Sequence, residues 1–458
     1  MVELTNAKTF NIDSFKECRR LMIVMAIPVF FELLLQMIMT YIDQYMVSSY
    51  SPISVAAIGN AEQILFLLLA TNSMLCNAIV VLISQYKGAG DIKKEKEVYV
   101  LAFWLNLLIG SLISVGILIF QIPIFKFMNL DQNVMLEAST YISIVGGSFL
   151  IPILISTFNA FFSGNGMMSI VMYVSVGTNI ANVIGNYILI FGRWGFPELG
   201  IQGAALSTAI SRFLGLGILI YFYYKKIGHS LSLKYLISFP VDLLKKLLYI
   251  GGPSALEPLV FNITQVILLS FINGLGLVST NTHVYVVMFS RFTVLHTNAM
   301  KRSSQIIVGM LCGSKRKEDA QNLALSAARI SALMTFFICI GLYLVSDGVF
   351  SLFTDNPAVF ALGSSVLLID IIRGAGRAYN LILVSTLQAV GEVIIPTTVA
   401  IISGFLITVW GGHILGIQLG MGLVGIYAAI TINEWTRAII SAIQWRIGKW
   451  KEKNLIGV

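Results

Sequence analysis

Long apolar segments recur along the whole chain and are separated by short polar stretches. Each is a continuous run of roughly 18 or more mostly apolar residues, long enough for one helix to cross a hydrocarbon layer about 30 Å thick. Continuous runs favour helices over barrel strands, in which apolar and polar residues alternate. The pattern predicts twelve transmembrane helices, at residues 21–46, 54–84, 98–121, 136–162, 167–191, 201–224, 247–272, 282–311, 323–346, 358–388, 394–418 and 423–446.

The composition agrees with an integral membrane protein. Of the 458 residues, 57% are hydrophobic and only 11% are charged, and the mean hydropathy is +0.85. A water-soluble domain carries about 25% charged residues. We therefore expect an all-α integral membrane fold rather than a soluble one.

Lysine and arginine predict the orientation of the chain, because cytoplasmic loops carry an excess of both residues. With the amino terminus in the cytoplasm, the cytoplasmic loops and the carboxyl tail hold Lys87, Lys93, Lys94, Lys96, Lys225, Lys226, Lys234, Lys245, Lys246, Lys315, Arg316, Lys317, Arg446, Lys449, Lys451 and Lys453. The opposite loops hold only Lys126 and Arg193. We expect a multi-pass protein of the cell's inner membrane with both termini in the cytoplasm. Anionic lipid headgroups then account for the net charge of +8, and we expect no nucleic acid partner.

The chain contains an internal repeat. A shift of 225 residues superposes four landmarks, namely Pro28 on Pro253, Glu32 on Glu257, Gly88 on Gly313 and Gly166 on Gly391. Each half has an even number of predicted spans, so both halves insert the same way up as parallel repeats. The sequence predicts a six-helix lobe at 1–224, a cytoplasmic linker at 225–246 and a second six-helix lobe at 247–458, with a transport cleft between the repeats.

We single out four of the carboxylates within predicted spans, because a charge at the bilayer centre costs roughly 2.5–3.5 kcal/mol and needs a reason. They are Glu32, Asp43, Glu257 and Asp370. At 100° per residue, Glu32, Gln36 and Asp43 lie within about 40° of one another, which predicts a polar stripe on the first helix. Glu32 has an alternative interpretation, as a solvated or helix-pairing residue.

Three asparagines form a second stripe on the fifth span, because Asn179, Asn182 and Asn186 stand at i, i+3 and i+7. Carboxylate and amide oxygens suit a hard cation such as Na⁺, and an isolated carboxylate in a low-dielectric site also binds a proton. We therefore expect a coupling-ion site. The alternative is that the asparagines form hydrogen bonds between helices.

The second half differs from the first. Leu268 stands where the repeat places Asp43, so that only Glu257, with Thr264 and Gln265 nearby, remains as polar chemistry on that span. Glu257 lies between Pro253 and Pro258, a context that favours a broken or bent helix. Glu257 is either functional or solvated at a helix end. For Asp370, an ion pair with Arg373 at i+3 is the plainer explanation.

The sequence lacks the Gly-x-x-x-x-Gly-Lys-Ser/Thr loop that holds ATP phosphates. We expect neither an enzyme nor a bound cofactor, and transport energised by a proton or sodium gradient.

Several segments resemble the multidrug and toxic compound extrusion (MATE) transporters. They are YIDQYMV at 41–47, AAIG at 56–59, GNYILIFG at 185–192 and GIQGAA at 200–205. The closing segments, NEWTR at 433–437 and WRIGKW at 445–450, are similar to the bacterial NorM-like branch. The resemblance runs from about residue 15 to the carboxyl end.

The resemblance implies a monomeric, proton- or sodium-driven antiporter that exports small cationic amphipathic compounds by alternating access. Asp43, Asn182, Asn186 and Thr208 match the positions that the family uses for its amino-lobe cation site, and Asn186 stands where some members carry a second aspartate. Glu257 matches the acidic residue of the carboxyl lobe in NorM-type members.

The tenth-span acidic position of those members falls near Gly374 or Arg377, so its role does not transfer to Asp370. Two rival functions stay open. One is a flippase for lipids or lipid-linked oligosaccharides, for which Arg212, Arg291, Lys301, Arg302 and Arg377 would supply positive charge. The other is a membrane sensor that transports nothing.

Overall fold

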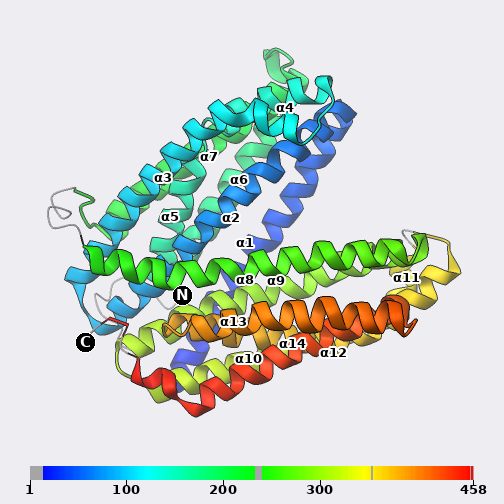
Figure 1. Cartoon of the computed structure of the whole chain (residues 1–458). Helices are drawn as coiled ribbons and strands as arrows, with labels where there is room; N and C mark the ends of the chain where they lie inside the picture. Colours follow the sequence, from blue (N-terminus) through cyan, green and yellow to red (C-terminus); the bar gives the residue numbers. More distant parts are fainter. Residues whose placement is uncertain (1–13, 233–239, 352–353, 454, 457–458) are drawn as a thin grey trace. The chain divides into compact units, whose positions relative to one another are not determined.

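The computed structural model describes residues 14–232, 240–351, 354–453 and 455–456. All regular elements in these residues are helical (Figure 1). In the first half the helices are α1 (Phe15–Tyr50), α2 (Pro52–Ala89), α3 (Ile92–Phe127), α4 (Gln132–Val145), α5 (Leu150–Gly164), α6 (Met168–Phe191), the short η2 (Arg193–Gly195) and α7 (Gly200–Lys226).

In the second half they are α8 (Val241–Gly274), α9 (Leu277–Gly313), α10 (Lys317–Leu344), α11 (Ser346–Phe350), α12 (Pro357–Ala389), α13 (Ile394–Ser403), η4 (Gly404–Gly411), η5 (Ile414–Gln418), α14 (Gly422–Ile447) and η6 (Lys449–Glu452). Residues 1–13 of the predicted cytoplasmic tail and 233–239 of the predicted linker lie outside the described residues.

Each of the twelve predicted spans corresponds to helical structure. Among the described residues, nine segments are long and apolar enough to cross a membrane, and the bent pair α4 and α5 makes ten. The segments that correspond to the eighth and twelfth predicted spans, α9 and α14, fall outside that count. Charged side chains interrupt both, including Lys301 in α9 and Glu434 and Arg437 in α14.

Three details differ from the sequence-based expectation. The fourth span is two helices, α4 and α5, which meet at a 48° bend. The eleventh begins as α13 and continues as the π-helical η4 and η5, a stretch that contains Gly404, Gly411, Gly412 and Gly416. A helix broken or bent at Pro253 and Pro258 was expected; the break is wrong, because α8 continues through both prolines, and the bend stays a prediction.

The described residues divide into two compact units. Unit 1 contains Phe31–Ile83 and Asp91–Leu248, and unit 2 contains residues 14–30, Ser84–Gly90 and the described part of Tyr249–Val458. The helix α1 is thus shared, with the boundary two residues after Pro28, where the ring removes a helical hydrogen bond. The predicted division into lobes 1–224 and 247–458 stays a prediction.

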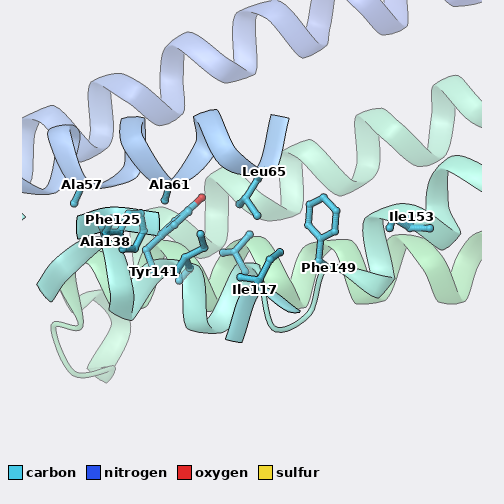
Figure 2. Packing of buried hydrophobic residues seen from close by; sticks show 12 residues of the cluster. Ala57, Ala61, Leu65, Ile117, Phe125, Ala138, Tyr141, Phe149 and Ile153 are labelled. Carbon is cyan, nitrogen blue, oxygen red and sulfur yellow. The ribbon is translucent and has the colours of Figure 1, made fainter. Parts of the chain in front are cut away.

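A continuous apolar cluster holds α2, α3, α4, α5 and α7 of unit 1 together. Small residues on α2, Ala57 and Ala61, face larger ones on α3 and α4, Ile117 and Tyr141 (Figure 2). Phe149, at the bend between α4 and α5, is fully buried in the same cluster. The bend is therefore packed against the core of unit 1.

In unit 2 the central element is α12, which packs against α9, α10 and α14. Two glycines allow the close approach of its neighbours. A Cβ at Gly376 would lie 2.7 Å from the Trp435 ring nitrogen on α14, and one at Gly374 would lie 3.0 Å from Cys339 Sγ on α10. The Trp435 indole also donates to the carbonyl oxygen of Ile372 across 3.0 Å.

The repeat is visible in the backbone. Gly166 and Gly391 both have positive φ, of 76° and 84°, and so do Gly90 and Lys315, which are also 225 positions apart. Lys315 therefore adopts, at φ 63°, a left-handed conformation that glycine supplies in the first half.

The ends of α2 and α9 contact each other through equivalent glycines of the two repeats. A Cβ at Gly88 would lie 2.0 Å from the carbonyl oxygen of Met310, and one at Gly313 would lie 2.0 Å from that of Gln85. Because Gln85 and Met310 are themselves 225 positions apart, the contact is reciprocal between the repeats. Both positions require glycine, because any side chain there would overlap the backbone of the other helix.

We expect Gly88→Ala to lower the midpoint of thermal unfolding in detergent, because the added methyl overlaps backbone and overpacking costs about 1–3 kcal/mol. Gly116→Ala on α3 is the matched control, because no atom lies within 4 Å of its Cβ. Equal midpoints for the two variants would show that the crossing of α2 and α9 does not need a glycine.

Candidate functional site

The polar centre of unit 1 is Asp43 on α1. Asn186 of α6 donates from Nδ2 to Asp43 Oδ1 across 3.0 Å. Asn182, one turn earlier on α6, lies between Asp43 and α7. With its amide nitrogen turned toward the carboxylate, it donates to Asp43 Oδ2 across 3.2 Å, and its oxygen lies 3.3 Å from Thr208 Oγ1. The structure therefore brings together four of the predicted site residues from three helices.

Glycines set the close packing of α6 and α7 that this arrangement needs. A Cβ at Gly185 would lie 2.4 Å from Ser207 Oγ, and one at Gly203 would lie 2.4 Å from the carbonyl oxygen of Leu189. The approach lets Ser207 donate to the carbonyl oxygen of Asn182 across 2.8 Å.

The side-chain oxygen of Asn186 is not engaged in a hydrogen bond with any described residue. Its side chain is only 3% exposed, and its Oδ1 has no hydrogen-bond partner among the described residues. An unsatisfied buried oxygen is costly, and this one belongs to the amide that contacts the Asp43 carboxylate. One carboxylate and neighbouring amide oxygens are a donor set that suits a hard cation.

A second acidic group lies near Asp43. Glu62 on α2 interacts electrostatically with Asp43, and it accepts a hydrogen bond from the hydroxyl of Tyr141 on α4 across 2.7 Å. Arg212 of α7 interacts electrostatically with that tyrosine. Glu62 is not among the predicted site residues, although it too is a carboxylate inside an apolar run.

Unit 2 holds a different polar network, in which carboxylates meet basic residues. Glu257 of α8 forms an ion pair with Arg437 of α14, and Gln388 of α12 lies 3.5 Å from its other oxygen. Glu434 of α14 accepts from Asn380 of α12 across 2.9 Å. Thus Glu257 has an arginine partner where Asp43 has only amides.

Asp370 is also neutralised within unit 2. It forms the expected i, i+3 ion pair with Arg373, and Ser290 of α9 donates to its Oδ2 across 3.0 Å. The guanidinium of Arg373 stacks on the ring of Tyr427, 5.3 Å from its centroid, and the Tyr427 hydroxyl lies 3.0 Å from His283 Nδ1. The ion pair that the i, i+3 spacing of Asp370 and Arg373 predicts is therefore present.

The family model MatE matches residues 28–188 and 253–412, about two thirds of the chain, and its two matched segments start 225 positions apart. The chain belongs to the MatE family.

Two relatives extend the comparison. The MatE chain is 35% identical to the uncharacterized transporter YisQ of Bacillus subtilis over 93% of its own length and 94% of that protein. It is 22% identical to the probable multidrug resistance protein NorM of Thermotoga maritima, over 97% and 96% of the two chains. The chain therefore matches both relatives over nearly their full length.

The structure of the Vibrio cholerae MATE transporter VcmN, in a mutant form, superposes with a TM-score of 0.87 at 19% identity, over 96% of this chain and 99% of that one. The predicted fold of twelve transmembrane helices in two six-helix repeats is thereby confirmed, and so is the resemblance to MATE transporters. The protein is a multi-pass membrane transporter of a multidrug efflux family.

The remaining predicted site residues lie apart from these contacts. Glu32 is buried on α1, in the same helix as Asp43. Within the described part of the chain, Gln36, Asn179 and Gln265 make no hydrogen bond to Asp43 or Glu257. The roles of all predicted site residues stay predictions.

No group of three His, Cys, Asp or Glu side chains in the described residues is placed to hold a metal ion. A site for Na⁺ would have to use neutral oxygens beside Asp43, namely those of Asn182 and Asn186. Ion coupling itself is a property of the MATE family to which the chain belongs.

The ion pair of Glu257 and Arg437 gives a direct prediction for stability. Arg437→Gln leaves a buried carboxylate without its partner, and we expect a loss of about 3–5 kcal/mol, read as a lower midpoint of thermal unfolding. The double variant with Glu257→Gln removes both charges and should recover most of the loss. Arg446→Gln, at an exposed arginine of α14, is the control. No recovery in the double variant would contradict the pairing.

Proposed function

We propose that the protein is a cation-coupled antiporter that exports small amphipathic organic compounds, with Asp43 as the carboxylate that the coupling ion and a cationic substrate occupy in turn. The observation that carries this proposal is the convergence of Asp43, Asn182, Asn186 and Thr208 from α1, α6 and α7. The relatives named as probable multidrug resistance proteins support the choice of substrate class.

The mechanism follows from the charge on Asp43. When Asp43 is ionised, both of its oxygens act only as acceptors, and the amides of Asn186 and Asn182 donate to them. Neutral amides leave the charge of the carboxylate uncompensated, so that the site attracts a cationic substrate. A proton or Na⁺ that enters from outside removes that attraction.

Entry of the ion also changes the hydrogen bonds of α1. Protonation adds an O–H donor to Asp43 and removes its negative charge, so the hydrogen bonds that it accepts from the asparagine amides become weaker. Sodium would instead draw the asparagine oxygens inward, and the unpartnered Oδ1 of Asn186 is suited to that role. Either event shifts α1 relative to α6 and favours the conformation that releases substrate.

We place both termini in the cytoplasm and the protein in the cell's inner membrane, on the distribution of lysine and arginine. We propose that it acts as a monomer, with a small-molecule substrate and membrane lipid as its partners and without a bound cofactor.

We expect Asp43→Asn to abolish gradient-driven efflux of ethidium from proteoliposomes, because the amide carries no charge and binds neither ion. A sodium gradient and a proton gradient are imposed separately, and the one that drives transport identifies the ion. Asp355→Asn, at an exposed aspartate, is the matched control.

Retained efflux in Asp43→Asn would refute the role of this carboxylate. No efflux by the unmutated protein under either gradient would refute antiport of cations and favour the flippase.

A further inference from the structure

A pocket of about 280 Å³ lies in unit 2, where the junction of α9 and α10 meets the residues that follow α14. We call it the tail pocket. Among the residues that line it are Lys315 and Lys317 of the junction, Gln85 near the end of α2, and Trp450 and Lys453 of the tail. Sites for small molecules have volumes of about 300–1,000 Å³, so the tail pocket is large enough for a small ligand or a lipid headgroup.

Three lysines and no carboxylate of the described residues line the tail pocket. Lys453 is neutralised by Glu392, whose carboxylate lies 2.8 Å from its Nζ. Lys317 donates to the backbone carbonyl oxygen of Lys451, which is a neutral acceptor. In the described part of the chain, Lys315 forms no hydrogen bond and no ion pair. Two of the three positive charges are therefore not balanced by a carboxylate.

The carboxylates on the neighbouring segments do not supply the missing negative charge. Glu318 pairs with Lys451, and Asp319 pairs with Arg316 across 2.7 Å. The segments that border the pocket, 312–319, 390–393 and 449–453, together hold six basic and four acidic side chains. The last turn of α2 adds Lys87 and no acidic residue. The surroundings of the pocket thus carry a surplus of at least two positive charges.

The backbone indicates that the side chain of Lys315 has a use. Lys315 is exposed, so water solvates its charge, but its φ is 63°, in the left-handed region. The first repeat has Gly90 at this position, with φ 71°, and Ile92 where the second has Lys317. Glycine adopts this conformation without the strain that a side chain adds, and such strain is retained mostly at functional sites. Both lysines therefore belong to the second repeat alone.

We propose that the tail pocket binds a phosphate monoester, held by Lys315 and Lys317, as the headgroup of an anionic lipid or as a small soluble organic phosphate. Two positive charges match the charge of about −1.5 to −2 that a phosphate monoester carries, and lysine is a common phosphate ligand. The pocket lies on the face that we place in the cytoplasm, where basic pockets at helix ends hold anionic headgroups.

The proposal goes beyond transport of a substrate, because the ligand would connect the junction of α9 and α10 with the tail. Val390 and Leu455 also line the pocket, beside the ring of the buried Trp450. These apolar groups can contact the carbon atoms of the ligand while the lysines hold its phosphate.

The test uses two probes with the same phosphate monoester, dioctanoyl phosphatidic acid and glycerol 3-phosphate. Binding to the purified full-length protein in detergent is measured by isothermal titration calorimetry. We expect the unmutated protein to bind at least one probe and not to bind dioctanoyl phosphatidylcholine, which lacks a monoester. Tighter binding of the phosphatidic acid assigns the pocket to a headgroup, and equal or tighter binding of glycerol 3-phosphate assigns it to a soluble phosphate.

Lys315→Gly should weaken binding about tenfold, the value of one charge-assisted hydrogen bond. It should leave the midpoint of thermal unfolding unchanged or raise it, because it supplies the residue that the first repeat has at Gly90. Lys317→Gln should weaken binding by a similar factor. Lys449→Gln, at an exposed lysine of the tail that does not line the pocket, is the matched control and should keep the affinity.

Failure of the unmutated protein to bind either probe would overturn the proposal. Unchanged affinity in folded Lys315→Gly and Lys317→Gln would also overturn it, and so would an equal loss in Lys449→Gln, because net charge alone would then explain the binding. The measurement needs neither Asp43 nor an ion gradient, so its outcome is independent of the efflux assay.

Discussion

Inside a membrane a charged side chain must find its partners within the protein, because hydrocarbon supplies no water to solvate it. The two units satisfy this constraint differently. In unit 1 the Asp43 carboxylate accepts hydrogen bonds from neutral amides of α6, which do not neutralise its negative charge. In unit 2 Glu257 and Asp370 are neutralised by Arg437 and Arg373. One duplicated fold therefore meets the same constraint with amides in one unit and with arginines in the other.

Glycines at helix crossings bring these groups within reach of one another. Gly185 and Gly203 let α6 and α7 approach until Asn182 meets Ser207 and Thr208. Gly376 does the same for α12 and α14, whose side chains Asn380 and Glu434 meet. In a membrane, where apolar surface alone does not drive helices together, close backbone approach and hydrogen bonds between helices take over that role.

The spans, the repeat and the carboxylate of the first unit were predictable, because each leaves a local pattern. Apolar runs predict helices, Gly88 and Gly313 recur at one offset, and Asn182 and Asn186 share a helix face with a period of 3.6. Their convergence on Asp43 was implied by resemblance to MATE transporters, since no periodicity relates positions 143 residues apart.

The rest depends on tertiary packing. Glu257 and Arg437 are 180 residues apart, and nothing local pairs them. The bend between α4 and α5 and the π-helical turns after Ser403 are set by contacts with neighbouring helices rather than by the apolar run in which they lie. Glu62 lies inside an apolar run like the carboxylates that were singled out, but its hydrogen bond with Tyr141 on α4 and its interaction with Asp43 on α1 depend on tertiary packing.

The central claim, that ion and cationic substrate compete for Asp43, is tested most directly by the ions released when substrate binds. Ethidium is added to purified protein in weakly buffered detergent solution, with proton release followed by a pH indicator and sodium release by radioactive sodium. The account predicts that binding of ethidium releases protons or sodium, and that Asp43→Asn releases neither. Ethidium binding at full affinity without release of either ion would contradict it, because substrate and ion would then occupy separate sites.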